Sequence, residues 1–140
     1  MKTMKQLLII AILLLTQSII AESDDALIRE TLTKYIDGST GGQPELLKEA
    51  FYKDLNLYYV KNNQISVWAG TAYIADTKEG QPTGEMGTIL SIDYTNNAAV
   101  AKVEIAHPKS KTPYIDYFML LKTNGTWTII HKMFTENIKK

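Results

Sequence analysis

The sequence has no cysteine among its 140 residues. This absence excludes disulfides, thiolate nucleophiles, cysteine metal sites and a lipid-modified amino-terminal cysteine. Histidine is scarce as well. Only His107 and His131 occur, and neither stands at a close spacing with carboxylates that is typical of metal ligands. We therefore expect no metal site and no bound cofactor.

An excess of charge of one sign is also lacking. The 15 lysines and arginines balance the 15 aspartates and glutamates. A chain without a basic stripe has no electrostatic footprint for nucleic acid, so we expect no nucleic-acid partner. The length suits one domain. Because it has no disulfides, a domain this small depends for its stability on its hydrophobic core or on oligomerisation.

Only one long hydrophobic run occurs, and it lies at the amino terminus. Two lysines precede an unbroken apolar stretch at residues 7–15, and the small residue Ala21 follows at a suitable cleavage position. This pattern predicts a secretory signal peptide at 1–21 and a mature domain at 22–140. The alternative is an uncleaved membrane anchor, but the run is shorter than the about 20 residues that a membrane-spanning helix needs.

The signal predicts where the protein works. We expect an exported protein, periplasmic or secreted, with no membrane span after signal cleavage. An exported chain without cysteine fits a bacterial envelope better than it fits a disulfide-rich secreted module.

Helical patterns come first in the mature chain. Ser23-Asp24-Asp25 combines capping side chains with negative charge, which favours a helix start. Apolar residues recur at helical spacing as far as Ile36, and the glycine-rich segment 37–42 is expected to end this helix. A proline in the first turn predicts a second short helix from Gln43. A third is predicted from Gly70 to Lys78.

Alternating and β-branched stretches predict strands between and after these helices. The expected strands span residues 55–60, 65–68, 86–94, 98–107 and the two arms of a hairpin at 114–134. Helices followed by an antiparallel meander predict an α+β fold, in which the helices lie across one face of a bent sheet.

The last hairpin has a well-defined turn. Asn124-Gly125 suits a type I′ turn, because both central positions need a positive φ. Regular pairing then gives one face the pairs Lys122–Trp127, Leu120–Ile129, Phe118–His131 and Asp116–Met133. The other face receives Leu121–Thr128, Met119–Ile130, Tyr117–Lys132 and Ile115–Phe134. Both faces are largely apolar, so we expect both to be covered.

The face that carries Asp116 is taken as the cavity side. A preceding hairpin closed so that His107 meets Tyr114 adds four small or branched residues to this face: Ala99, Ala101, Val103 and Ile105. On the opposite, outer face the same pairing predicts an ion pair between Glu104 and Lys132.

One stretch is the most specific part of the sequence: Asp116-Tyr117-Phe118-Met119-Leu120-Leu121-Lys122, with Gly125, Trp127, Ile129-Ile130 and Lys132. Together with the helical segments before it, this pattern resembles the nuclear transport factor 2-like superfamily and, within it, the exported members of the lumazine-binding family. The resemblance implies a cone-shaped, cystatin-like fold, with N-terminal helices packed on a strongly curved antiparallel sheet and an apolar cavity open at one end. It also implies a homodimer through the outer face of the sheet.

Six residues are candidates for binding a ligand in that cavity: Tyr35, Trp68, Tyr73, Asp116, Phe118 and His131. Tyrosine and tryptophan offer a stacking face and a hydrogen-bonding tip, which suits a flat polar molecule. The alternative is that most of the aromatic residues simply fill the core.

Asp116 has two interpretations. As a general acid or base it would move a proton, with His131 polarising a carbonyl or carrying that proton. As a structural or ligand-orienting residue it would accept hydrogen bonds from Tyr35, Tyr73 or Trp68. We favour the second role, and Asp116 and His131 remain only candidates for catalysis.

The sequence therefore favours an exported binding or accessory protein that holds an apolar or heteroaromatic molecule in a cone-shaped cavity. One alternative is a ketosteroid-isomerase- or cyclase-like enzyme that uses Asp116 for proton transfer. Another is a dimerisation or protein-interaction module whose cavity is filled. The fold cannot decide among them, since many functions share it.

Overall fold

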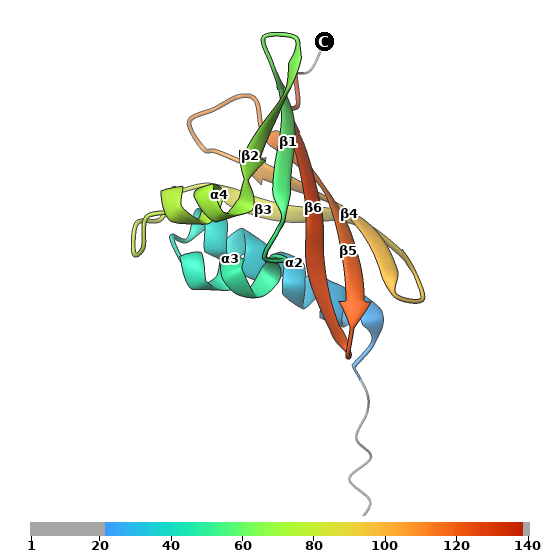
Figure 1. The fold of residues 1–140 in the computed structure, drawn as a ribbon. Coiled ribbons are helices and arrows are strands. Elements are labelled where there is room, and N and C mark those ends of the chain that lie inside the picture. The colour runs from blue at the N-terminus through green and yellow to red at the C-terminus, as the bar shows by residue number, and fades with distance from the viewer. Residues whose placement is uncertain (1–21, 139–140) are drawn as a thin grey trace, which may run out of the picture.

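The computed structural model describes residues 22–138 (Figure 1). The predicted signal peptide at 1–21 lies outside the described residues. The helices are α2 (Asp24–Thr40), α3 (Pro44–Ala50) and α4 (Gly70–Asp76). The strands are β1 (Asn56–Lys61), β2 (Gln64–Ala69), β3 (Met86–Thr95), β4 (Ala98–Ala106), β5 (Tyr114–Thr123) and β6 (Thr126–Glu136). The predicted α+β class is confirmed.

The six strands form one sheet in the order β2-β1-β6-β5-β4-β3. Neighbouring strands are antiparallel except β1 and β6, which are parallel. The later strands β3 to β6 form the predicted meander, and the β1–β2 hairpin is added to it through the pairing of β1 with β6. This hairpin extends beyond the rest of the sheet in Figure 1. The sheet curves around α2, and this arrangement leaves a concave inner face and an outer face.

The first helix begins where the sequence predicts, because the Ser23 side chain accepts a hydrogen bond from the Ala26 amide at 3.2 Å. The helix also ends inside the predicted segment 37–42, at Thr40 with Gly41 as its cap, although the first residues of that segment are still helical. Gly38 lies inside the helix because α3 packs closely there. A Cβ atom at Gly38 would lie 2.8 Å from Cγ of Leu47.

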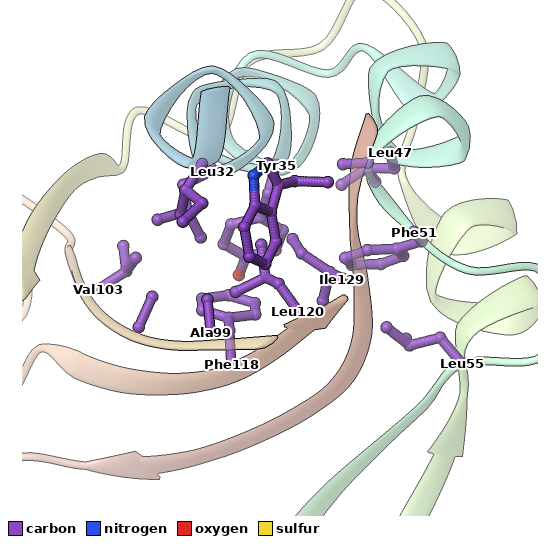
Figure 2. Packing of buried hydrophobic residues seen from close by; sticks show 14 of the residues in the cluster. Leu32, Tyr35, Leu47, Phe51, Leu55, Ala99, Val103, Phe118, Leu120 and Ile129 are labelled. Carbon is purple, nitrogen blue, oxygen red and sulfur yellow. The ribbon is translucent and has the colours of Figure 1, made fainter. Parts of the chain in front are cut away.

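The hydrophobic core lies between α2 and the concave face of the sheet. Figure 2 shows Leu32 and Tyr35 directed from the helix toward the sheet residues Phe118, Leu120 and Ile129. All five of these side chains are buried. Removing such apolar area from water is the main driving force that holds the helix to the sheet.

The inner residues predicted for β4 are all buried: Ala99, Ala101, Val103 and Ile105. The predicted pairing with β5 is nevertheless wrong by two residues, because Val103 lies opposite Asp116 and Ala101 opposite Phe118. Successive side chains alternate between the faces of a strand, so a shift of two residues leaves the faces unchanged.

The last hairpin departs from regular pairing at a β-bulge. Thr123 pairs with Thr126 and Leu120 with Ile129, as predicted, but Met119 then pairs with His131. Ile130 is the extra residue, without a partner on β5. From this point to the end of β6, every side chain lies on the face opposite to the predicted one.

Candidate functional site

The bulge exchanges two polar residues between the faces of the sheet. Lys132 pairs with Phe118 and points inward, whereas His131 pairs with Met119 on the outer face. The His131 ring stacks on Tyr58, with 4.8 Å between the ring centroids. The prediction that His131 shares a face with Asp116 is wrong, and so is the predicted outer ion pair between Glu104 and Lys132.

Lys132, Tyr35 and Asp116 form a connected group at the inner face. The Tyr35 hydroxyl donates a hydrogen bond to Asp116 Oδ2 at 2.6 Å. Lys132 Nζ donates to the Tyr35 oxygen at 2.6 Å and lies 3.2 Å from Asp116 Oδ2. The three residues come from β6, α2 and β5. They join the first helix of the described chain to its last two strands.

The group is buried. Lys132 retains 4% of its accessible surface and Asp116 retains 1%. A buried charge is costly unless it is paired and hydrogen-bonded. Each charge here has the other as its partner, and the phenol of Tyr35 contacts both. No fully buried side-chain nitrogen or oxygen of residues 22–138 is without a hydrogen-bond partner.

Aromatic rings surround the ammonium group of Lys132. Its Nζ lies 4.8 Å from the ring centre of Tyr35, 5.1 Å from Phe134, 5.2 Å from Tyr73 and 5.9 Å from Phe118. At these distances the negative face of a ring attracts a cation. The rings therefore add favourable contacts to the charged end of Lys132, where little water reaches it.

Tyr35 is held in its neutral form. Burial raises the pKa of its phenol well above the ordinary value, and the neighbouring Tyr73 and Asp116 raise it further. The hydroxyl hydrogen is thus present at physiological pH and is engaged by Asp116. This hydrogen bond, with the one accepted from Lys132, keeps all three groups in a single arrangement.

The group forms the floor of a cavity of about 260 Å³ whose lining comes mainly from α2, α4 and the sheet. Five lining residues are largely apolar or aromatic: Trp68, Tyr73, Ile105, Tyr114 and Phe134. Five supply polar groups: Tyr35, Ser39, Glu85, Asp116 and Lys132. An adjoining hollow of about 400 Å³ shares Ser39, Trp68, Tyr73 and Glu85 with it, so the cavity continues toward the segment 76–83.

The structure brings four of the six predicted ligand-binding residues to this cavity: Tyr35, Trp68, Tyr73 and Asp116. Phe118 lies behind the wall, with its ring edge-on to Tyr35 at 4.8 Å, and His131 lies on the other side of the sheet. Tyr35 is also one of the three hydrogen-bond donors predicted for Asp116.

Sequence reasoning missed Lys132 because the bulge carries no glycine or other residue that would mark it. It also missed the wall residues Tyr114 and Phe134, whose rings meet edge to face at 6.2 Å. The only available signal was a lysine within an otherwise apolar strand. Such a lysine needs a buried partner if it points inward.

A groove of about 680 Å³ between α3 and α4 is larger than this cavity. Its charged residues are surface groups such as Lys48, which pairs with Glu45 at 2.5 Å. No buried polar group converges on it as Lys132 and Asp116 do on the cone. We therefore take the smaller cavity as the candidate site, because binding sites combine apolar walls with a few convergent polar groups.

Within residues 22–138 no cluster of three or more histidine or acidic side chains could hold a metal ion. No helix in the same range is long and apolar enough to cross a membrane.

A family model described as "Putative lumazine-binding" matches residues 23–135. The chain belongs to this family. The match spans the three helices and six strands of the described fold, except for Glu136 at the end of β6. No curated protein matches the sequence.

Solved structures share the fold of this family member. An NTF2-like protein from Methylobacillus flagellatus is 25% identical, with a TM-score of 0.70, over 85% of this chain and 98% of the other. One from Shewanella baltica is 23% identical, with a TM-score of 0.70, over 83% and 95%. A cystatin-like domain from Nostoc punctiforme is 16% identical, with a TM-score of 0.62, over 83% and 78%. All three are described as having unknown function, so they support the NTF2-like fold and no activity.

Proposed function

We propose that this protein binds a small, flat, polar molecule in the cavity lined by α2, α4 and the sheet. The observation that carries this proposal is the floor of the cavity, where a buried ammonium and a buried carboxylate lie side by side. Stability alone gives little reason to keep such a pair, since apolar residues of similar volume often stabilise a core as well or better. A ligand that uses the pair accounts for it.

The walls fit the same kind of ligand. Trp68 and Tyr73 meet edge to face at 5.0 Å, and Tyr114 and Phe134 form a second aromatic pair. Aromatic side chains suit a heteroaromatic ring, because they stack on its faces. A volume of about 260 Å³ lies just below the about 300–1,000 Å³ of typical ligand pockets, so the ligand is compact. The family description, lumazine-binding, agrees with such a molecule.

The test is recovery of a ligand with the purified protein. Native mass spectrometry of protein purified from its own host should show a bound small molecule, and a metabolite panel should raise its melting temperature. Trp68→Ala should abolish both effects, whereas Tyr52→Ala, exposed outside the cavity and the outer sheet face, serves as the matched control and should change neither. Empty protein without any thermal shift across the panel would contradict the proposal.

We also propose that the protein works outside the cytoplasm. The support is the sequence pattern at 1–21, with two lysines followed by an apolar run and a small residue. Expression with an epitope at the carboxyl terminus, followed by cell fractionation, tests this. A shortened chain in the periplasm or medium is expected, and full-length protein in the cytoplasm would contradict export.

Proton-transfer catalysis by Asp116 is the alternative function, favoured by the place of this residue in the cavity lining. Two findings weigh against it. His131, the proposed partner, lies on the other side of the sheet. Asp116 is also engaged by Lys132 and Tyr35, so a substrate proton would compete with both. If the protein is an isomerase or cyclase, Asp116→Asn should abolish turnover in protein that circular dichroism shows to be folded.

The outer face of the sheet supports a homodimer. It carries exposed apolar residues from three strands: Val100, Tyr117, Met119, Leu121 and Met133. Exposed Val60, Ile65 and Val67 of the β1–β2 hairpin add to the exposed apolar surface. Contiguous exposed apolar surface of this kind is typical of interfaces. A protein-interaction module with a filled cone is not supported, given the cavity described above.

Analytical ultracentrifugation tests the dimer. Wild-type protein should sediment as a dimer and Met119→Glu as a monomer, because the new charge would be buried at the interface. Tyr52→Glu, exposed on α3's side of the fold, is the control and should remain dimeric. A wild-type monomer over the whole accessible concentration range would contradict this proposal and would leave the cavity proposal unaffected.

A further inference from the structure

The hydrogen-bonding capacity of the cavity floor is only partly used. An ammonium group has three N–H donors. Lys132 directs one to the Tyr35 oxygen and lies against Asp116 Oδ2. No other hydrogen bond of this ammonium is present among residues 22–138, so one donor is unused, and Lys132 lines the cavity.

Asp116 has unused capacity beside it. Its Oδ2 atom accepts from Tyr35 and contacts Lys132, whereas Oδ1 accepts no hydrogen bond from any residue in the range 22–138. Asp116 is 1% exposed and lines the cavity, so Oδ1 is the carboxylate oxygen with no partner among residues 22–138 that a ligand in the cavity would meet.

Tyr35 fixes which of the two groups donates and which accepts. Its hydrogen is directed to Asp116 and its oxygen accepts from Lys132, so the carboxylate stays an acceptor and the ammonium a donor. Burial keeps the pKa of the phenol high, which maintains this arrangement over the physiological pH range. A ligand thus meets one donor and one acceptor side by side, in a fixed order.

We infer that the ligand is recognised through a cis-amide edge, the N–H and C=O pair of a lactam or cyclic imide. This inference rests on the proposed function and specifies its ligand class. The ligand carbonyl accepts from Lys132 Nζ, and the adjacent ligand N–H donates to Asp116 Oδ1. The flat ring that carries the edge then lies between the aromatic pairs Trp68–Tyr73 and Tyr114–Phe134.

The same floor excludes other classes of small molecule. A carboxylate ligand would satisfy Lys132 but place a second negative charge against Asp116. An amine would satisfy Asp116 but repel Lys132. An N-methylated lactam keeps its carbonyl but has no donor, and so leaves Asp116 Oδ1 without a partner in a site that the ligand has closed to water. A buried polar group left unpaired in this way costs binding energy.

The test uses matched ligand pairs on the unmodified protein. Isothermal titration is carried out with lumazine and with thymine, each compared with its fully N-methylated counterpart. Loss of a hydrogen bond to a charged group predicts that methylation weakens binding by about 10- to 100-fold. Equal affinities within both pairs would overturn the cis-amide inference while the cavity proposal stands. No binding of any of the four compounds would overturn both.

A double variant identifies the residues responsible. Lys132→Met combined with Asp116→Leu removes both buried charges together, which preserves the balance that a single substitution would break. It should bind lumazine and methylated lumazine equally. If the double variant still binds lumazine more tightly than methylated lumazine, the inference is overturned. If this variant does not fold, the comparison of ligand pairs on the wild-type protein still decides.

Discussion

The Lys132 ammonium lies 2.6 Å from the Tyr35 hydroxyl and joins the last strand to the first helix. The contact exists because Ile130 is accommodated in a β-bulge, which turns Lys132 inward and His131 outward. One unpaired residue in β6 therefore determines which polar groups enter the cone. The character of the candidate site follows from it.

Removing the Lys132 charge alone should destabilise the protein strongly. Lys132→Met leaves Asp116 as a buried charge without its cation, a change that costs about 3–5 kcal/mol. Urea denaturation followed by circular dichroism measures the loss. Lys61→Met, on an exposed lysine of β1, is the control and should stay within about 0.5 kcal/mol of the wild type. A loss below about 1 kcal/mol for Lys132→Met would contradict the burial of a paired charge.

Much of the fold could be predicted from the sequence, because the features concerned are determined by residues close together in the chain. The Ser23 cap and the Asn124-Gly125 turn each depend on a few adjacent residues, and both occur as predicted. The prediction of which β4 residues point inward is also confirmed, because the small residues of this strand alternate with larger or polar ones.

The register of β6 could not be predicted in the same way. Trp127-Thr128-Ile129-Ile130 and the residues after it are apolar on both faces, so no alternation shows which residues point inward. The bulge depends on contacts with the rest of the fold, and Ile130 gives no local sign of it. The aromatic candidates were found because they come from α2, β2 and α4, where the prediction did not depend on this register.

Alkaline pH should weaken the fold through Tyr35. Burial raises the pKa of this phenol above about 10, the value expected in the unfolded chain. Above that pH the unfolded state loses the proton and the folded state keeps it. The free energy of unfolding therefore falls as the pH rises.

Urea denaturation between pH 8 and pH 12, a window around the ordinary tyrosine pKa of about 10, measures this fall. Tyr35→Phe should reduce its slope. Tyr117→Phe, on the exposed outer face, should keep the slope of the wild type. If the free energy of unfolding falls with pH equally in the wild type and in Tyr35→Phe, the pKa of Tyr35 is not the cause of the fall.

Acid should weaken the contact between the first helix and the last hairpin. Asp24 Oδ1 accepts hydrogen bonds from Lys122 Nζ at 2.5 Å and Trp127 Nε1 at 3.0 Å. The bond from Lys122 is the main cause that lowers the pKa of Asp24, and the bond from Trp127 adds to it. The hydrogen bonds of ionised Asp24 therefore stabilise the fold above a pH of about 3.9, the pKa of aspartate in the unfolded chain. This stabilisation is lost as the pH falls below that value.

The denaturation midpoint as a function of pH measures this loss. Asp24→Asn should lower the midpoint at neutral pH and flatten its dependence on pH below about 4. Asp25→Asn, one residue along the same helix, is the matched control and should keep the slope of the wild type. An unchanged slope in Asp24→Asn would show that the contact contributes nothing.

Gly38→Ala should destabilise the protein although alanine favours a helix more than glycine does. The new methyl group would lie 2.8 Å from Cγ of Leu47, and overpacking of this kind costs about 1–3 kcal/mol. A double-mutant cycle with Leu47→Ala isolates the clash. In the Leu47→Ala background, Gly38→Ala should be neutral or stabilising. The same cost in both backgrounds would exclude the clash as its cause.

The most direct test of the central claim uses the two tryptophans of the chain as paired reporters. Trp68 forms part of the cavity wall, whereas the indole N–H of Trp127 is bonded to Asp24 at the other end of β6. Lumazine is titrated into isotopically labelled protein, and both indole N–H signals are followed by two-dimensional NMR. A ligand in the cone should shift the Trp68 signal and leave that of Trp127 in place. A Trp68 signal that stays unmoved at saturation, with shifts confined to the α3–α4 groove or the outer face, would contradict the account.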